Sequence, residues 1–436
     1  MITKIDVDRA FLFDPAVCVM LRAELIGSIP IGLLEHAIKN TTKKYELLNS
    51  RILEDECGNF YFAPMESPLT PQIITENAFL TTEEFINTYQ KQYFDLDKGN
   101  LIKFIIQKKP HSLLLSICLH HLAGDGKSAL YLLEDILLNL EMQIESNVLP
   151  NSNINSIPIH AFSKNYLHTL CTQSNSSLPF AETINKRWRK ENFVPNLANK
   201  NELFHKHWKN AQTFAKSKIV SAQETKYLCC LCKKNNVTVN SALITMILKK
   251  LRVLKNFLVA MDFRNEEYSG YGNYSVAPQL SLYYQQNQTF WENANRIHKL
   301  LREAYLDHKS LSQQLLFNTH FENSLLSSAY LQKENMIDNK VVKDYMNSTG
   351  SLKEQIPLVI SNIGINPIKE KYNTFEIQEL SFVSPIFMQL DCNIGIITSN
   401  GKMAINMLYR KSEINYSELL SDVVEQIHYL TSSETT

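Results

Sequence analysis

The residues best suited to chemistry form one short segment, HHLAGDG, at positions 120–126. A neutral imidazole takes a proton from a hydroxyl or amine near pH 7, and such general-base assistance is worth roughly 10²- to 10⁴-fold in rate. Gly124 and Gly126 allow the backbone to approach a ligand closely. Backbone N–H groups at the start of a following helix would face negative charge that develops on an acyl carbonyl. The segment therefore predicts a general-base site.

Two other interpretations apply to the same residues. In the first, the two histidines are structural side chains. In the second, His and Asp ligate a metal, although three ligands from one loop would lack the outer partners that usually orient them. Adjacent histidines followed at fixed spacing by Asp-Gly are rare in a chain of this composition, which favours the functional interpretation. We therefore expect no metal.

The segment lies between two predicted elements. Residues 112–119 are apolar without polar alternation, which is typical of a strand covered on both faces, and a similar strand is expected at 101–107. A helix is expected from about 127 to 141, because Leu130, Leu133, Leu137 and Leu140 fall on one face. The order strand, loop, helix holds the histidines on a rigid element.

The rest of the chain also mixes helices and strands. We expect helices at 30–40, 82–90, 222–234 and 415–430, a helix capped by Asn240, a strand at 257–261 and a hairpin at 393–409 that turns at Asn400-Gly401. Residues 143–180 are rich in Asn, Ser and Pro and are interpreted as a connection. The predicted fold is α/β with mixed sheets, in an N-terminal lobe at 1–178 and a C-terminal lobe at 179–436.

Composition excludes several classes of function. The 436 residues contain 44 Lys plus Arg and 44 Asp plus Glu, so no basic field exists for nucleic acid or anionic lipid. No apolar run approaches the roughly 18 to 20 residues of a membrane span, and charged residues near the N-terminus replace the apolar stretch of a secretory signal. We expect a cytoplasmic protein. The eight cysteines lack zinc-binding spacing and are interpreted as reduced thiols.

The string HHLAGDG resembles the HHxxxDG signature of the condensation-domain and acyltransferase superfamily, which also contains chloramphenicol acetyltransferase and alcohol and polyketide-associated acyltransferases. Weaker family-like strings follow the same order along nearly the whole chain. They are DRAFLF at 8–13, LLNSRI at 47–52, YFDLDKG at 93–99, TVN at 238–240, DFR at 262–264, Gly272-Asn273 and SNIG at 361–364.

The resemblance implies two chloramphenicol-acetyltransferase-like lobes in a V, with a central tunnel at the signature. His121 matches the general base, which removes a proton from an acceptor as it attacks an acyl thioester, and His120 matches a supporting residue. Gly126 matches a position where bulk would obstruct the tunnel. Asp125 matches a structural aspartate paired with an arginine, here Arg264. A charge at a lobe junction needs such a partner, since breaking one side of a buried pair costs about 3 to 5 kcal/mol.

Four further residues are candidates for tunnel or substrate contacts. Asp262 belongs to the DFR string, Asn273 follows Gly272, and Ser361 and Asn362 begin the SNIG string. An ordinary turn is the alternative interpretation for Asn273 and for the pair Ser361 and Asn362.

The implied function is acyl transfer from a thioester to a hydroxyl or amine of a small metabolite, in secondary metabolism. The donor would be acyl-CoA or an acyl-carrier protein carrying phosphopantetheine, with no tightly bound cofactor, and we expect a monomer. A free-standing enzyme is favoured, because the N-terminus lacks the Ser-x-Ala-Gln opening and the length leaves no room for a carrier domain. The alternatives are an amide-forming condensation enzyme and a non-catalytic relic that binds a carrier protein. The basic run at 186–190 would suit an acidic carrier, or is a solvated helix face.

Overall fold

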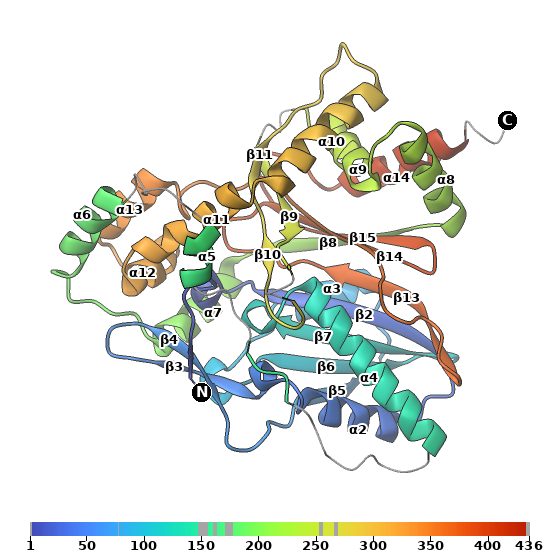
Figure 1. The fold of residues 1–436 in the computed structure, drawn as a ribbon, viewed down its shortest axis with the longest axis horizontal. Helices are drawn as coiled ribbons and strands as arrows, with labels where there is room; N and C mark the ends of the chain where they lie inside the picture. Colours follow the sequence, from blue (N-terminus) through green and yellow to red (C-terminus); the bar gives the residue numbers. More distant parts are fainter. Residues whose placement is uncertain are drawn as a thin grey trace.

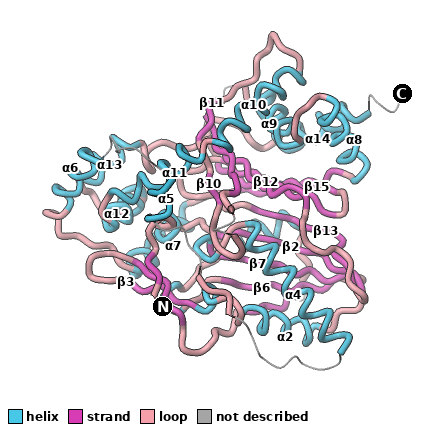
Figure 2. The backbone as a smooth tube through the Cα atoms, viewed as in Figure 1, coloured by secondary structure: helices cyan, strands magenta, loops and turns pink. Residues whose placement is uncertain are grey.

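The computed structural model describes residues 2–76, 78–146, 156–159, 164–170, 178–252, 256–265 and 269–432. The chain folds around two large β-sheets with helices packed on their outer sides (Figure 1). Figure 2 shows the strands gathered in the middle of the molecule, with most helices around them. The predicted α/β class with mixed sheets is confirmed.

The sheet of the N-terminal lobe has five strands in the order β13-β2-β7-β6-β5. Neighbouring strands are antiparallel except β5 and β6, which are parallel. Every residue of β7 after the first is buried, which confirms a strand covered on both faces. The bounds are β2 (Cys18–Gly27), β5 (Gln72–Glu76), β6 (Ile102–Lys108), β7 (Ser112–His120) and β13 (Phe375–Val383).

Helices α2 (Ile31–Thr42) and α4 (Gly126–Ser146) pack together on one side of this sheet (Figure 1). The four leucines that predicted α4 are all buried, because a helix turns its apolar stripe toward the sheet. The helix at 82–90 is observed as α3 (Thr82–Tyr89), with a capping box between Thr81 and Glu84. A small sheet extends the lobe and consists of β1 (Thr3–Lys4), β4 (Phe60–Pro64) and β3 (Ser50–Glu54).

The sheet of the C-terminal lobe runs in the order β10-β9-β12-β14-β15-β8, with β11 also paired to β9. Strand β12 is parallel to both of its neighbours, and the other pairs are antiparallel. The bounds are β8 (Thr213–Val220), β9 (Asn256–Asp262), β10 (Ser275–Val276), β11 (Gln279–Ser281), β12 (Val359–Ile365), β14 (Cys392–Ser399) and β15 (Lys402–Arg410).

The predicted hairpin joins β14 to β15. Asn400 and Gly401 have φ angles of 49° and 73°, the left-handed conformation that a two-residue hairpin turn requires. Helices α8 (Ala222–Lys234), α9 (Val239–Lys250), α10 (Phe290–Leu306) and α14 (Leu419–Ser432) belong to this lobe. The prediction that Asn240 caps α9 is wrong. The cap is Thr238, whose hydroxyl accepts a hydrogen bond from the backbone N–H of Ser241 at 3.1 Å.

The remaining helices are α1 (Ala10–Phe13), α5 (Lys164–Leu170), α6 (Leu178–Trp188), α7 (Leu197–Asn210), α11 (His308–Phe317), α12 (Asn323–Lys333) and α13 (Lys340–Thr349), with short 3₁₀ turns at η1 (Glu46–Asn49), η2 (Leu96–Lys98), η3 (His121–Ala123) and η4 (Asn318–His320). The predicted connection at 143–180 begins inside α4, and most of it lies outside the described residues. Within the described part of the chain, no helix is both long and apolar enough to cross a bilayer.

One strand ties the two lobes together. Strand β13, from the second half of the chain, pairs with β2 from Phe375↔Gly27 to Val383↔Met20 and so completes the N-terminal sheet. It also lies directly against β14, where a Cβ at Gly395 would come within 2.7 Å of the Phe382 carbonyl oxygen. The boundary at residue 178 stays a prediction. The second half of the chain contributes one strand, β13, to the N-terminal sheet.

Candidate active site

The HHLAGDG segment connects β7 to α4 at the junction between the lobes. Strand β7 ends at His120, a single 3₁₀ turn covers His121–Ala123, and α4 begins at Gly126. The backbone N–H of His121 donates to the carbonyl of Val17 at 3.1 Å, which fixes the turn to the neighbouring chain. Gly124 has a φ of 149°, and a Cβ there would meet the Cβ of Ser128 at 2.8 Å. The turn therefore requires glycine at this position.

The ring of His121 is held between aromatic side chains. Phe11 stacks on it with a centroid distance of 4.4 Å and an interplanar angle of 3°, and Phe387 lies 5.7 Å away on a tilted plane. Burial lowers the pKa of His121 below its ordinary value of 6.5, while the charge of Asp125 acts in the opposite direction. His121 is therefore neutral at pH 7, as a general base must be.

His121 lines a cavity of about 230 Å³ between the lobes. Its walls come from distant parts of the chain, namely the N-terminal segment, the signature, β9, β12, β14 and α11. The lining residues are Val7, Asp8, Ala10, Phe11, His121, Ala260, Ser275, Val276, Ala277, Gln314, Leu315, Asn318, Val359, Ser361, Ser384, Phe387 and Asn393. The general-base candidate thus faces a space that a small molecule can enter.

His120 has a different environment. Its side chain is buried, its Nδ1 accepts a hydrogen bond from the backbone N–H of Leu122 at 3.2 Å, and the ring of Phe94 meets it edge-on. Burial, followed by the charges of Lys200 and His121, lowers the pKa of His120 well below 6.5. His120 is not among the residues that line the cavity, so its contacts support the loop.

Asp125 and Arg264 form the ion pair that the sequence predicted. Their side chains are 6% and 8% exposed, and two hydrogen bonds of 2.8 and 2.9 Å join the guanidinium to both carboxylate oxygens. The carboxylate also accepts the backbone N–H groups of Ser128 at 2.9 Å and Tyr274 at 3.0 Å. Because Asp125 already has these partners, its oxygens serve the structure of the loop.

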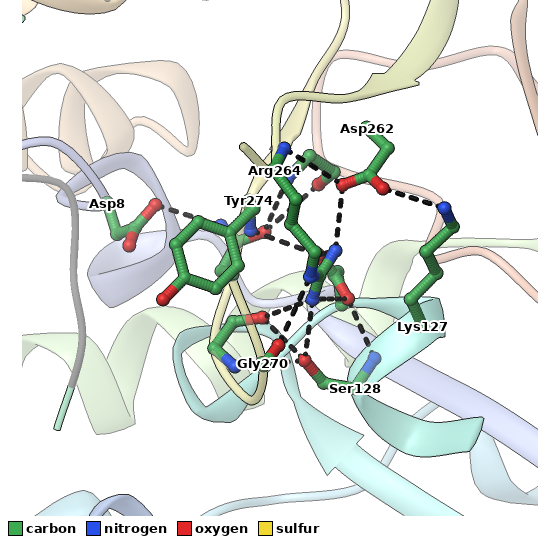
Figure 3. Close-up of polar contacts among 11 residues, drawn as sticks. Asp8, Lys127, Ser128, Asp262, Arg264, Gly270 and Tyr274 are labelled. Atoms are coloured by element: carbon green, nitrogen blue, oxygen red, sulfur yellow. Dashed lines mark hydrogen bonds and ion pairs between the residues drawn. The ribbon is translucent and has the colours of Figure 1, made fainter. Parts of the chain in front are cut away.

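The guanidinium of Arg264 extends this network to both lobes (Figure 3). It donates to the hydroxyl of Ser128 at 3.0 Å and to the carbonyls of Gly270 and Gly272. Burial alone would lower the pKa of Arg264, but the charges and hydrogen bonds of Asp125 and Asp262 raise it. The arginine is fully charged and fastens the signature to the C-terminal lobe.

Asp262 joins the same network from the end of β9. Its carboxylate accepts from Arg264 at 2.9 Å and from Lys127 of α4 at 2.7 Å. Burial would raise the pKa of Asp262, but Lys127 and Arg264 hold it below its usual range. These residues line a second, smaller cavity of about 60 Å³. The two cavities share Ala260, Ser275 and Ser361 as lining residues and therefore adjoin.

Gly126 lines the second cavity and has no room for a side chain. A Cβ at this position would lie 2.7 Å from a ring carbon of Phe382, on β13. Any larger residue would push the ring or fill the space beside it. The geometry gives a physical reason for a glycine at this point of the signature.

The other predicted contact residues occupy different places. Ser361 lines both cavities, and Asn362 lines the second while its side chain also contacts Asn240 and the N–H of Gly364. Asn273 lines neither cavity. Its amide donates to Asp8 at 2.8 Å, and its oxygen accepts from the hydroxyl of Ser275 at 3.0 Å.

Sequence reasoning missed several residues of the larger cavity. Asp8 and Phe11 lie in the DRAFLF string, which was noted for its resemblance and not for chemistry. Ser384 and Phe387 lie in the loop that follows β13, and Asn393 lies at the start of β14, where no motif marks them. Among the described residues, no three His, Cys, Asp or Glu side chains gather as metal ligands would.

Comparison with known proteins shows the fold. No protein-family model matches the chain, and no curated protein sequence is significantly similar to it. Among solved structures, polyketide synthase associated protein 5 from Mycobacterium tuberculosis is similar with a TM-score of 0.64 and 12% identity, over 99% of this chain and 98% of that one. The condensation domain of the monacolin K polyketide synthase MokA gives 0.62 and 11%, over 99% and 97%.

A third similar structure is SgcC5 protein from Streptomyces globisporus, in complex with a naphthyl ethanediol and sucrose. It gives a TM-score of 0.60 and 14% identity, over 96% of this chain and 93% of that one. The chain has the fold of condensation domains, which is the fold that the resemblance implied. The V-shaped arrangement of two lobes is consistent with these neighbours.

Proposed function

We propose that the chain is an acyltransferase that moves an acyl group from a thioester to a hydroxyl or amine of a small molecule. The observation that carries the proposal is a neutral, buried His121 that faces a cavity at the lobe junction. The fold agrees with this chemistry, since similar structures include condensation domains.

In the proposed reaction His121 is the base. Nδ1 of the ring is buried and has no hydrogen-bond partner, so Nε2 is the nitrogen left to accept a proton from the acceptor. The acceptor oxygen or nitrogen then attacks the thioester carbonyl and forms a tetrahedral intermediate. The intermediate collapses to the ester or amide, and the departing thiolate takes the proton back from His121. The step needs no further reactant.

The larger cavity is the one that His121 lines, so the acceptor would bind there. The donor would be acyl-CoA or the phosphopantetheine arm of an acyl-carrier protein. A similar structure holds a diol, which supports a hydroxyl-bearing acceptor. The amide-forming alternative has the same support from condensation domains and differs only in the acceptor atom. A non-catalytic relic is less well supported, because the base, the Asp125–Arg264 pair and Gly126 are all in place.

The basic run at 186–190 offers little free charge for a carrier protein. Arg187 pairs with Asp344 at 2.5 Å, and Arg189 pairs with Glu322 at 2.6 Å. Trp188 is buried and donates to the hydroxyl of Ser324. These contacts favour the interpretation of the run as a partly neutralised helix face, so a carrier donor would dock elsewhere.

The test is an assay of the full chain with a panel of acyl thioesters and acceptors. Thiol release and product mass are measured for the wild type, His121→Ala and, as a matched control, the surface variant His111→Ala. We expect His121→Ala to lose about 10²- to 10⁴-fold in rate, with the control unchanged. Unchanged turnover in His121→Ala would contradict the proposal.

A further inference from the structure

The wall of the larger cavity contains an acidic residue and, within the described part of the chain, no Lys or Arg. Among the described residues that line it, Asp8 is the only acidic one and His121 is the only other titratable one. The remaining lining residues are apolar, aromatic, hydroxyl or amide side chains. A ligand in this cavity therefore meets a carboxyl group and no cation.

Asp8 also has no cation of its own. Its Oδ1 accepts from the amide of Asn273 at 2.8 Å, and within the described parts of the chain no Lys or Arg pairs with it. The adjacent Arg9 turns away and donates to the carbonyls of Gly58 and Asn323. Figure 3 shows Asp8 at one end of the polar network, with Lys127 at the other. The basic side chains of the site thus lie away from this carboxyl.

The Asn273 amide has a fixed orientation, because its oxygen accepts from Ser275 while its nitrogen donates to Asp8. Burial raises the pKa of Asp8 to about 7, against the effect of the Asn273 hydrogen bond, and the charge of Asp125 adds to the rise. The carboxylate form of Asp8 is thus short of favourable partners. A positive charge beside it would supply what the protein does not.

A second residue of the cavity wall, Asn393, has an acceptor atom without a hydrogen-bond partner. Asn393 is 1% exposed, and its amide nitrogen donates to the hydroxyl of Ser384 at 3.0 Å and to the carbonyl of Pro385 at 2.6 Å. Both hydrogens of the amide are used, yet Oδ1 has no hydrogen-bond partner. Buried oxygen atoms without a partner are rare in folded proteins, so this part of the cavity wall is incompletely hydrogen-bonded.

We propose that the cavity beside His121 binds an acceptor that carries a protonated amine, and that Asp8 is the residue that recognises the ammonium group. That this ligand is the acyl acceptor rests on the proposed acyl transfer, whereas its recognition by Asp8 does not. Anionic molecules are disfavoured in this cavity by the same carboxylate.

The experiment compares three probes of one shape and different charge: phenethylammonium, 2-phenylethanol and 3-phenylpropionate. Their dissociation constants are measured at pH 8 by ligand-observed NMR with the full chain, so no enzymatic turnover is needed. The variants are Asp8→Asn, Asp8→Glu and, as a matched control, Asp6→Asn. Asp6 lies two residues away, pairs with Lys4 and does not line the cavity.

We expect the wild type to bind phenethylammonium about tenfold more tightly than the alcohol, the gain of one charge-assisted hydrogen bond. The propionate should bind most weakly. Asp8→Asn should abolish the preference, while Asp8→Glu and Asp6→Asn should keep it. Equal binding of the three probes, no binding of the ammonium probe, or a preference that survives Asp8→Asn would overturn the proposal. A lost acyl transfer with intact ammonium binding would instead count against the proposed function alone.

Discussion

The two adjoining cavities at the lobe junction differ in whether the polar groups of their walls are paired. The smaller one is bordered by three ion pairs, Asp125–Arg264, Asp262–Arg264 and Lys127–Asp262, which connect the signature and α4 with the end of β9. The larger one contains a carboxyl without a cation and an amide oxygen without a partner. Ion pairs therefore hold the lobes together at the smaller cavity. In the larger cavity, beside His121, polar groups lack partners that a ligand could supply.

The largest expected effect on stability comes from breaking the buried Asp125–Arg264 ion pair. Arg264→Met leaves Asp125 charged and buried, which should lower the free energy of unfolding by about 3 to 5 kcal/mol. Urea denaturation followed by circular dichroism measures it. The double variant Asp125→Asn/Arg264→Met should recover part of the loss, because no lone charge remains. A loss below about 1 kcal/mol in the single variant would show that the pair does not fasten the lobes.

Crowding the smaller cavity should have the next largest effect. Gly126→Ala places a Cβ against the Phe382 ring and should cost about 1 to 3 kcal/mol of stability, together with a lower rate of acyl transfer. The matched control is Gly32→Ala in α2, where a Cβ would meet no atom within 4 Å. Thermal denaturation and thiol release are measured for both. Equal behaviour of the two variants would contradict the assigned crowding.

The pH dependence of kcat/KM should report the environment of His121 in the larger cavity. Burial lowers the pKa of His121, and the base works only when neutral, so kcat/KM should rise with pH and reach half its plateau below pH 6.5. Phe11→Leu removes the stacked ring and admits water, so the midpoint should move upward toward 6.5. Stopped assays between pH 5 and 8 measure it. A wild-type midpoint above 6.5 would be incompatible with a desolvated base.

The smallest effect is expected at the outer ion pair. Lys127 and Asp262 are 34% and 27% exposed, so their pair is partly screened by solvent. Lys127→Met should change the free energy of unfolding by at most about 1 kcal/mol. A similar loss of unfolding free energy in Lys127→Met and Arg264→Met would show that the whole ion-pair network, and not the buried Asp125–Arg264 pair alone, holds the lobes together.

Much of this arrangement could be predicted from local sequence. The strand before the histidines and the helix after them follow from apolar spacing, and the turn at Asn400-Gly401 follows from its backbone preference. The pairing of Asp125 with Arg264 was implied by the resemblance of HHLAGDG and DFR to known motifs, and it agrees with the need of a buried charge for a partner.

The rest depends on contacts between residues far apart in the chain. Nothing local shows that β13 crosses to the N-terminal sheet, or that Asn273 reaches Asp8 across 265 positions. Asn393 lies in an ordinary-looking strand, and its unpaired oxygen appears only when Ser384 and Pro385 are placed beside it. Thr238 caps α9 in place of Asn240 because its hydroxyl lies three residues before the Ser241 N–H.

The central claim is that His121, and not its neighbour, is the base. The most direct measurement is kcat/KM for acyl transfer in His121→Gln and His120→Gln, two variants that change adjacent residues in the same way. The account predicts a loss of about 10²- to 10⁴-fold for His121→Gln and a much smaller loss for His120→Gln, whose effect should appear in thermal stability. Equal losses, or a larger loss at His120, would contradict it.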